Sequence, residues 1–188
     1  GDYANLEDVQ PYSQYLNEVI EEQDDITNNF EISLEGIKDQ NNNSVSLQEH
    51  EGKQAFIWTV DTEYIEFNVN VPEDGVFQME FDYYLKTGES IPAIRSMYIN
   101  GTYPFEESND LIFYRYFKDK SEPVLNSLGD QTRPSQIEIP GWRTQKIINS
   151  SGISPEPFKI YLEKGEYTFR INYIQGDMAI GGIRFTVP

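Results

Sequence analysis

Cysteine is absent from this 188-residue chain, and histidine occurs only once. The lack of cysteine excludes disulfides, thiolate nucleophiles, zinc–thiolate sites and iron–sulfur clusters together. The single histidine, His50, lies in a polar stretch, which favours a solvated loop residue over a general base. No GxSxG motif occurs. A glycosidase carboxylate pair stays open, because a sequence does not show the separation of two carboxylates. Nothing demands catalysis, and we predict that the chain is not an enzyme.

Basic residues are scarce. Fourteen Lys and Arg stand against 32 Asp and Glu, for a formal net charge of −18. Such a charge repels phosphate backbones and anionic lipid headgroups, so we expect no nucleic acid partner. Long apolar runs are also missing, since no stretch reaches the roughly 18 residues of a membrane span. We therefore expect no membrane insertion by this chain.

Aromatic and turn-forming residues are abundant instead: 13 Tyr, 11 Phe, 13 Gly and 10 Pro. Aromatic side chains favour pleated, half-buried strands, and Gly and Pro favour turns. The apolar alternation predicts about ten short strands at near-regular spacing, which is typical of a sandwich or jelly roll. The predicted fold class is an all-β jelly-roll β-sandwich with a short N-terminal helix.

Three turn signals divide the clearest strands. Alternating apolar residues over 65–71 and 77–83 flank a turn at 72–75, which predicts a hairpin with one buried face. A similar pattern over 160–173 predicts a second hairpin. Asn100-Gly101 is the typical two-residue turn of a third hairpin, because both turn positions require positive φ.

The N-terminal segment has a different pattern. Residues 11–22 carry apolar side chains at helical spacing, with Pro11 near the first turn. Residues 1–31 contain nine acidic and no basic residues. We divide the chain into an acidic helix or linker at 1–29 and a β-sandwich module at 30–188, and leave open whether the helix docks.

Aromatic residues in the central region indicate sugar binding. Sugars are bound by flat aromatic faces together with planar hydrogen-bonding side chains. Segment 111–117 is aromatic on both faces of its predicted strand, so one set points outward unless both faces are covered, which is an equal alternative. The loop at 118–136 is long enough to carry function. We predict Trp142, Tyr114 and Tyr116 as stacking platforms, with Arg115, Asp130 and Arg133 as hydrogen-bonding groups.

Metal binding has one partial signal. Asp39, Asn41 and Asn43 match the first oxygen positions of a calcium loop, but Ser44 and His50 stand at its Gly and Glu positions. This mismatch excludes an EF-hand and favours an Asn-rich turn. Scattered oxygen ligands leave no linear signature, so a structural calcium ion stays open as a cofactor, without assigned ligands.

Four segments, at 57–85, 95–107, 126–142 and 156–183, in combination resemble the N-terminal module of large extracellular solute-binding lipoproteins of Firmicutes. The resemblance covers about 53–188. It implies a galactose-binding-like β-sandwich, similar to calcium-containing carbohydrate-binding modules, on a protein that serves ATP-driven sugar uptake (an ABC transporter). It implies an extracellular location at the bacterial cell surface and transfers no ligand residues.

The leading hypothesis is therefore a non-catalytic extracellular carbohydrate-binding module of a sugar-uptake solute-binding protein. Its expected partners are an oligosaccharide or glycan and the remaining domains of the parent protein. The alternative is a structural or protein-interaction spacer without its own ligand, because sandwich folds serve many roles. The chain starts at Gly1 without a start methionine, so we expect the signal peptide and membrane anchor in a longer chain.

Overall fold

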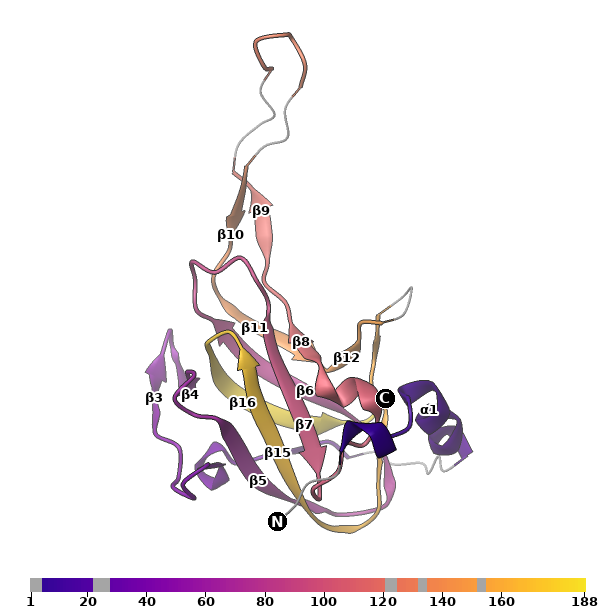
Figure 1. Ribbon diagram of the computed structural model, residues 1–188. Coiled ribbons are helices and arrows are strands. Elements are labelled where there is room, and N and C mark those ends of the chain that lie inside the picture. The colour runs from indigo at the N-terminus through magenta and orange to yellow at the C-terminus, as the bar shows by residue number, and fades with distance from the viewer. Residues whose placement is uncertain (1–4, 22–27, 121–124, 132–134, 152–154) are drawn as a thin grey trace.

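The computed structural model describes residues 5–21, 28–120, 125–131, 135–151 and 155–188. Two antiparallel sheets face each other across one core (Figure 1). The first sheet has the order β11-β6-β16-β4-β3, with β1 beside β16 and β14 beside β6; the second has the order β2-β5-β15-β7-β8. The predicted all-β sandwich with a short N-terminal helix is confirmed.

The strand bounds follow the alternating segments of the sequence. The first sheet contains β1 (Phe30–Glu31), β3 (Leu47–His50), β4 (Lys53–Trp58), β6 (Gly75–Leu85), β11 (Trp142–Lys146), β14 (Ile160–Leu162) and β16 (Met178–Thr186). The second contains β2 (Lys38–Asp39), β5 (Tyr64–Val71), β7 (Ala93–Ile99), β8 (Leu111–Phe113) and β15 (Gly165–Gln175). Two small ribbons pair β9 (Phe117–Asp119) with β10 (Gln136–Glu138) and β12 (Ile148–Asn149) with β13 (Glu156–Pro157).

Aromatic side chains join the two sheets. Successive side chains on a strand point to opposite faces, so alternate residues of β6 and β5 enter the core. Phe169 of β15 lies edge-on to Phe185 of β16, with ring centroids 5.3 Å apart, and Phe81 of β6 meets Phe113 of β8 at 5.2 Å. All four rings are at most 1% exposed. Replacing one such buried Phe by Ala would lower the free energy of unfolding by roughly 3–5 kcal/mol.

Two of the predicted hairpins are wrong. Strands β5 and β6 belong to different sheets, so the turn at 72–75 crosses the sandwich instead of closing a hairpin. The same holds for β14, which pairs with β6, and β15, which pairs with β5 and β7. The alternation is correct in each strand because both sheets bury one face in the same core. Periodicity therefore identifies the strands without showing which of them pair.

The Asn100-Gly101 turn does form. The two residues have φ of 50° and 79°, and Ile99 and Thr102 exchange two backbone hydrogen bonds. The ladder ends at this single bridge, because the chain turns into a short 3₁₀ segment, η3 (Glu106–Asn109). The prediction of the turn is confirmed, while the second strand of that hairpin is absent from the described residues.

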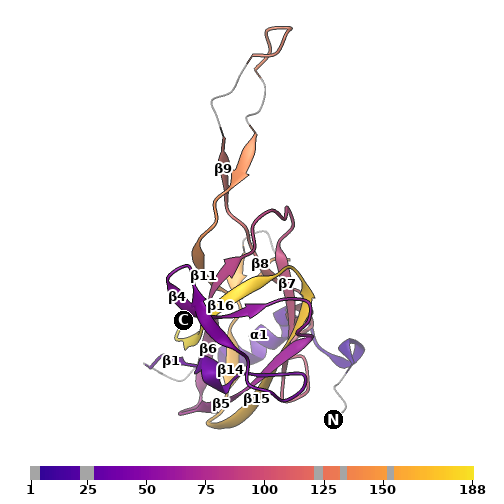
Figure 2. The ribbon, with the colours of Figure 1, turned by 90° about the vertical axis from the view of Figure 1, so that its left-hand side faces the viewer.

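Helix α1 (Tyr12–Glu21) docks against the sandwich (Figure 2). Tyr12 is 5% exposed, and its ring packs on Phe105 at 4.8 Å and on Phe158 at 4.7 Å. The backbone N–H of Lys159 donates to the Tyr12 hydroxyl, and that of Tyr161 donates to the Tyr15 hydroxyl. Burial raises the pKa of Tyr15 to about 12. Two further 3₁₀ segments are η1 (Leu6–Asp8) and η2 (Leu34–Gly36).

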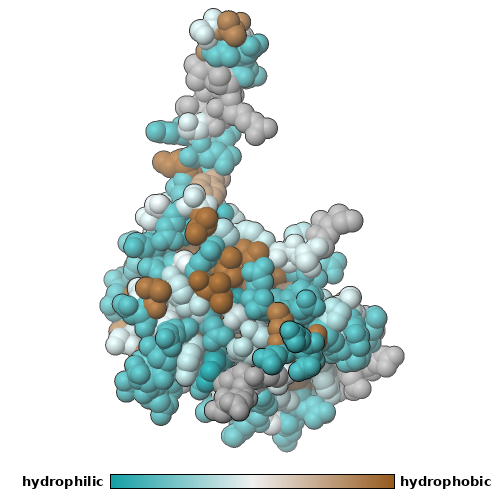
Figure 3. Space-filling view, viewed as in Figure 1, coloured by the Kyte–Doolittle hydropathy of each residue, from teal (hydrophilic) through white to brown (hydrophobic). Residues whose placement is uncertain are grey.

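A long arm projects from one end of the sandwich (Figures 1 and 2). We define the arm as residues 114–139, described at 114–120, 125–131 and 135–139; the β9–β10 ribbon forms its lower part. Hydrophobic residues reach its far end (Figure 3). Among the described residues, seven of the ten exposed large hydrophobic side chains lie on it: Tyr114, Tyr116, Phe117, Leu125, Leu128, Ile137 and Ile139.

Candidate functional site

The outer face of the first sheet carries both the polar and the aromatic residues of β6. Because Phe81 and Tyr83 face the core, Asp82 and Tyr84 face outward. On β11 the cross-strand partners of these two residues are Thr144 and Trp142, respectively. The outer face is therefore ionic around Asp82 and aromatic around Tyr84.

An ionic cluster surrounds Asp82. Arg184 donates from Nη1 to Asp82 Oδ2 at 2.8 Å and from Nη2 to Oδ1 at 2.6 Å, and it also contacts Glu80 at 2.9 Å. Lys53 Nζ lies 2.9 Å from Oδ2, and the Thr144 hydroxyl donates to Oδ1 at 2.7 Å. The Arg184 hydrogen bonds, against the cost of desolvation, hold the pKa of the Asp82 carboxyl well below its usual range. These contacts saturate the carboxylate and leave it no capacity for a ligand.

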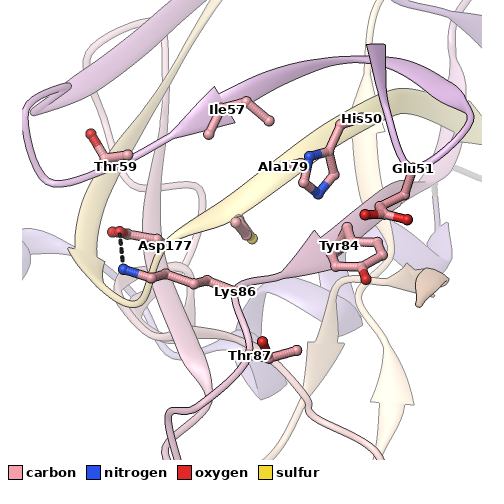
Figure 4. Close-up of a pocket in the computed structure, with 10 residues that line it drawn as sticks. His50, Glu51, Ile57, Thr59, Tyr84, Lys86, Thr87, Asp177 and Ala179 are labelled. Carbon is pink, nitrogen blue, oxygen red and sulfur yellow. Dashed lines mark ion pairs between the residues drawn. The ribbon is translucent and has the colours of Figure 1, made fainter. Parts of the chain in front are cut away.

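The aromatic end of the outer face contains a pocket of about 440 Å³ (Figure 4). This volume lies within the usual range for small-molecule sites. Its walls come from the β3–β4 turn, from β4, from the end of β6 and from the start of β16. The lining residues are His50, Glu51, Ile57, Thr59, Tyr84, Lys86, Thr87, Asp177, Met178 and Ala179.

One side of the pocket is aromatic. The Tyr84 ring lies edge-on to His50 at 4.8 Å and to Trp142 at 5.7 Å. Trp142 Nε1 donates to the backbone oxygens of His50 and Glu51, which ties the indole to the β3–β4 turn. A Cβ at Gly181 would lie 2.9 Å from Trp142 Cζ3, so the missing side chain there makes room for the indole against the sheet.

The opposite side of the pocket is polar (Figure 4). Lys86 Nζ lies 4.0 Å from Asp177 Oδ2, and the Tyr173 hydroxyl donates to Asp177 Oδ1 at 2.7 Å. The threonines Thr59 and Thr87 add hydroxyl groups to the lining. The pocket thus presents an aromatic wall to one side of a ligand and a carboxylate with a nearby ammonium to the other.

The structure separates the predicted sugar-binding residues into two places. Trp142 lies beside the pocket, whereas Tyr114, Arg115 and Tyr116 lie at the base of the arm around a hollow of only about 10 Å³. Arg143, which alternates with Trp142 on β11, stacks on Tyr116 at 4.5 Å. Trp142 and the Tyr116 contact therefore use opposite faces of β11.

Two other predicted residues have different surroundings. The Arg115 side chain is 1% exposed and forms ion pairs with Glu138 at 2.8 Å and Glu89 at 3.2 Å. It also donates to the backbone oxygens of Lys86 and Ile91, which fastens the arm to the β6–β7 loop. Asp130 lies exposed in the outer part of the arm, and Arg133 lies outside the described residues. The roles predicted for these residues in sugar binding stay predictions.

Sequence reasoning missed most of the pocket. The expectation that His50 is a solvated loop residue is wrong, because it ends strand β3 and lies partly buried against Tyr84. Tyr84 could have been found, since the alternation that sends Tyr83 into the core leaves Tyr84 on the outer face. Lys86 and Asp177 carry no linear signal.

Within the described ranges, no group of three or more His, Asp or Glu side chains is arranged so that it could hold a metal ion. Asp39 Oδ1 instead accepts from the backbone N–H groups of Asn41 and Asn43, at 2.9 and 3.0 Å. This confirms the predicted Asn-rich turn. In the part of the chain that the structure describes, no helix is long and apolar enough to cross a membrane.

The fold and the pocket together define a β-sandwich module with a ligand-sized hollow on one outer sheet face. No protein-family model and no curated protein matches the chain. Among solved structures, it is similar to a family 35 carbohydrate-binding module from Clostridium thermocellum, with 17% identity over 86% of this chain and 100% of that chain and a TM-score of 0.50. A family 6 module from LamC, a marine laminarinase of Zobellia galactanivorans, matches at 16% identity over 85% of this chain and 100% of that chain, with a TM-score of 0.45. The first similarity shows the fold.

Proposed function

We propose that the chain is a non-catalytic carbohydrate-binding module that takes a sugar unit into the pocket beside Tyr84 and Trp142. The observation that carries the proposal is the pairing of an aromatic wall with a carboxylate and an ammonium group across one pocket. A sugar ring has an apolar C–H face and a rim of hydroxyls, so both sides of the pocket find a complementary surface. The solved carbohydrate-binding module of the same fold supports this assignment.

The wider setting is part of the same proposal. We place the module at the outside of a bacterial cell, on a solute-binding lipoprotein of an ABC sugar transporter, where it captures an oligosaccharide for uptake. The support is the resemblance of four sequence segments to such proteins. The acidic surface agrees with a neutral glycan as ligand, because a net charge of −18 repels polyanions.

The test is a titration of the protein with neutral oligosaccharides, with and without calcium. Trp fluorescence reports on the pocket, because Trp142 adjoins the pocket whereas Trp58 is fully buried in the core. We expect saturable binding by calorimetry and a fluorescence change. The variant Tyr84→Leu should weaken binding roughly tenfold or more, as loss of a central aromatic contact does.

A control variant separates this pocket from the base of the arm. Tyr116→Ala removes an aromatic side chain of similar size that lies outside the pocket. If Tyr116→Ala weakens binding and Tyr84→Leu does not, the sugar binds at the predicted Tyr114–Tyr116 cluster and the pocket assignment is wrong. Thermal unfolding of both variants must show that the fold is retained.

The arm supports a second function, protein interaction. A two-stranded ribbon is marginally stable by itself in water, and exposed hydrophobic residues gather on this one. We propose that the occupant of the arm is a neighbouring domain of the same polypeptide. Hydrogen exchange of the arm amides, measured with and without the neighbouring domain, tests this proposal. Both functions are compatible, because the arm and the pocket use different surfaces.

A further inference from the structure

The turn between β15 and β16 presents Asp177 to the pocket in a tightly constrained geometry. Gly176 has φ of +84°, and a Cβ there would lie 2.8 Å from the Cα of Ala93. Any other residue would meet both a steric clash and an unfavourable backbone conformation. The turn therefore requires glycine at position 176, immediately before Asp177.

A buried arginine, Arg95, is hydrogen-bonded to the backbone of this turn. Arg95 is fully buried and donates to the backbone oxygens of Gln175 and Gly176, both at 2.8 Å. Its guanidinium lies over the rings of both Trp58 and Tyr173, with Cζ 4.3 Å from each ring centroid. Burial lowers the pKa of Arg95 to about 9, so the group stays charged at neutral pH. No carboxylate of the described residues lies within ion-pair distance of Arg95; its guanidinium donates to the backbone oxygens of Ile94, Gln175 and Gly176.

The two carboxylate oxygens of Asp177 have different surroundings, one hydrogen-bonded within the protein and the other at the pocket. Tyr173, stacked on Arg95, donates its hydroxyl to Oδ1 at 2.7 Å. Among the described residues, the polar partner of Oδ2 is Lys86 Nζ, at 4.0 Å, which is longer than a direct hydrogen bond. Lys86 is 66% exposed, so it gains little from the pair. Oδ2 thus remains an acceptor, and Nζ a donor, at the polar side of the pocket.

This arrangement has a chemical preference. A hydroxyl that donates to Asp177 Oδ2 can have its neighbour accept from Lys86 Nζ, so two adjacent hydroxyls bridge the pair. A sugar carboxylate brought to the same place would meet the negative charge of Asp177 directly and that of Glu51 across the pocket, and Lys86 is the one cationic side chain among the lining residues. Unlike charges across a site give specificity, and like charges suppress the wrong ligand.

We infer that Asp177 is the specificity-determining residue of this pocket, that Tyr173 and Arg95 position it, and that the ligand is an uncharged sugar with two adjacent free hydroxyls. The inference rests on the proposed function, since it names the ligand class of the same pocket.

The experiment compares matched pairs of methyl glycosides by calorimetry: glucose with glucuronate, galactose with galacturonate and mannose with mannuronate. We expect the protein to bind at least one neutral member, and to bind its uronate at least tenfold more weakly. The deoxy analogue that lacks one of the two bridging hydroxyls should lose affinity to a similar degree, because a site built for a hydroxyl leaves its own polar groups unpaired without it.

Three variants locate the effect. Asp177→Asn should lower the affinity for the neutral sugar at least tenfold. It should also reduce the difference in affinity between the neutral sugar and its uronate. Tyr173→Phe keeps the ring against Arg95 but removes the hydroxyl that donates to Asp177 Oδ1. It should lower the affinity for the neutral sugar severalfold, with little change in the unfolding midpoint. Asp119→Asn removes the same charge from the exposed arm. It should change neither the affinity for the neutral sugar nor the difference in affinity between the sugar and its uronate.

The outcomes separate the two claims. Binding of a neutral sugar that is unchanged in Asp177→Asn, or a uronate that binds as tightly as its neutral partner, overturns this inference and leaves the proposed function standing. If binding of the neutral sugar is lost in Asp119→Asn as well as in Asp177→Asn, overall charge decides and the specific role of Asp177 is wrong. No sugar binding by the unmodified protein overturns the proposed function and this inference together.

Discussion

Asp82 connects four strands through one carboxylate. It stands on β6, and its partners Arg184, Thr144 and Lys53 stand on β16, β11 and β4. The carboxylate is 9% exposed, so its charge is tolerated only because every oxygen is hydrogen-bonded. This cluster holds the strands that carry Trp142, Tyr84 and the pocket in register, without touching the pocket itself.

The stability of the protein should therefore fall in acid, and Asp82 should account for part of the loss. The pKa of Asp82 is depressed in the folded state, while it is about 3.9 in an unfolded chain. The unfolded state then takes up a proton first, so the stabilisation is present above about pH 4 and is lost as the pH falls below it. Urea unfolding at pH 7, 4 and 3 measures this decline.

The variant Asp82→Asn keeps the size of the side chain and removes the charge. We expect it to lower the free energy of unfolding at pH 7 by about 2–3 kcal/mol, because Arg184 and Lys53 lose a charged partner. Its stability should then change less between pH 5 and 3 than that of the wild type. Parallel decline of the two proteins over that range would show that other carboxylates carry the acid sensitivity.

At the scale of elements, helix α1 is part of the structural unit of the sandwich through two tyrosines. Tyr12→Ala should lower the free energy of unfolding by about 3–5 kcal/mol, because a buried aromatic ring is lost between Phe105 and Phe158. Tyr12→Phe removes only the hydroxyl that accepts from the Lys159 N–H, and should cost about 0.5–1.5 kcal/mol. Urea unfolding checks both; a wild-type midpoint for Tyr12→Ala would mean that the helix is undocked in solution.

The elements also show how far the sequence could predict this fold. Strands β5 and β6 are visible in the alternation of apolar residues, since that pattern depends only on which face is buried. Their assignment to opposite sheets depends on long-range pairing with β15 and β16, which local patterns do not contain. The Asn100-Gly101 turn was predictable because positive φ is a local requirement.

The same limit applies to the candidate site. Trp142 was predicted as a stacking residue from its position after a Pro-Gly turn; the structure places it half-buried beside the pocket, and its role in sugar binding stays a prediction. The pocket itself is assembled from three segments, near residues 50, 84 and 177, that meet only when β4, β6 and β16 lie side by side. Nothing in any one segment distinguishes Asp177 from the other 31 acidic residues. Its distinction arises from the contact with Tyr173.

At the scale of the whole molecule, charge is unevenly divided between arm and body. By sequence, residues 114–139 contain four basic residues (Arg115, Lys118, Lys120 and Arg133) and four acidic ones (Asp119, Glu122, Asp130 and Glu138). The remaining residues therefore hold 10 basic and 28 acidic residues, which is the whole net charge of −18. A partner with an acidic surface meets repulsion at the body and none at the arm. Hydrophobic exposure and neutrality coincide on the arm, as expected for a protein contact.

We therefore expect the arm to be covered in a longer form of this protein. Backbone amides of β9 and β10 should exchange hydrogen rapidly in the present chain, because an isolated ribbon opens easily, and slowly when the neighbouring domain is attached. Amides of β6 lie in the core sheet and should be protected equally in both forms, which makes them the internal control. Replacing Leu125 and Leu128, which are 67% and 85% exposed, by Ser should restore rapid exchange in the longer form without changing β6. Equal exchange of the arm in both forms would show that the neighbouring domain does not contact it.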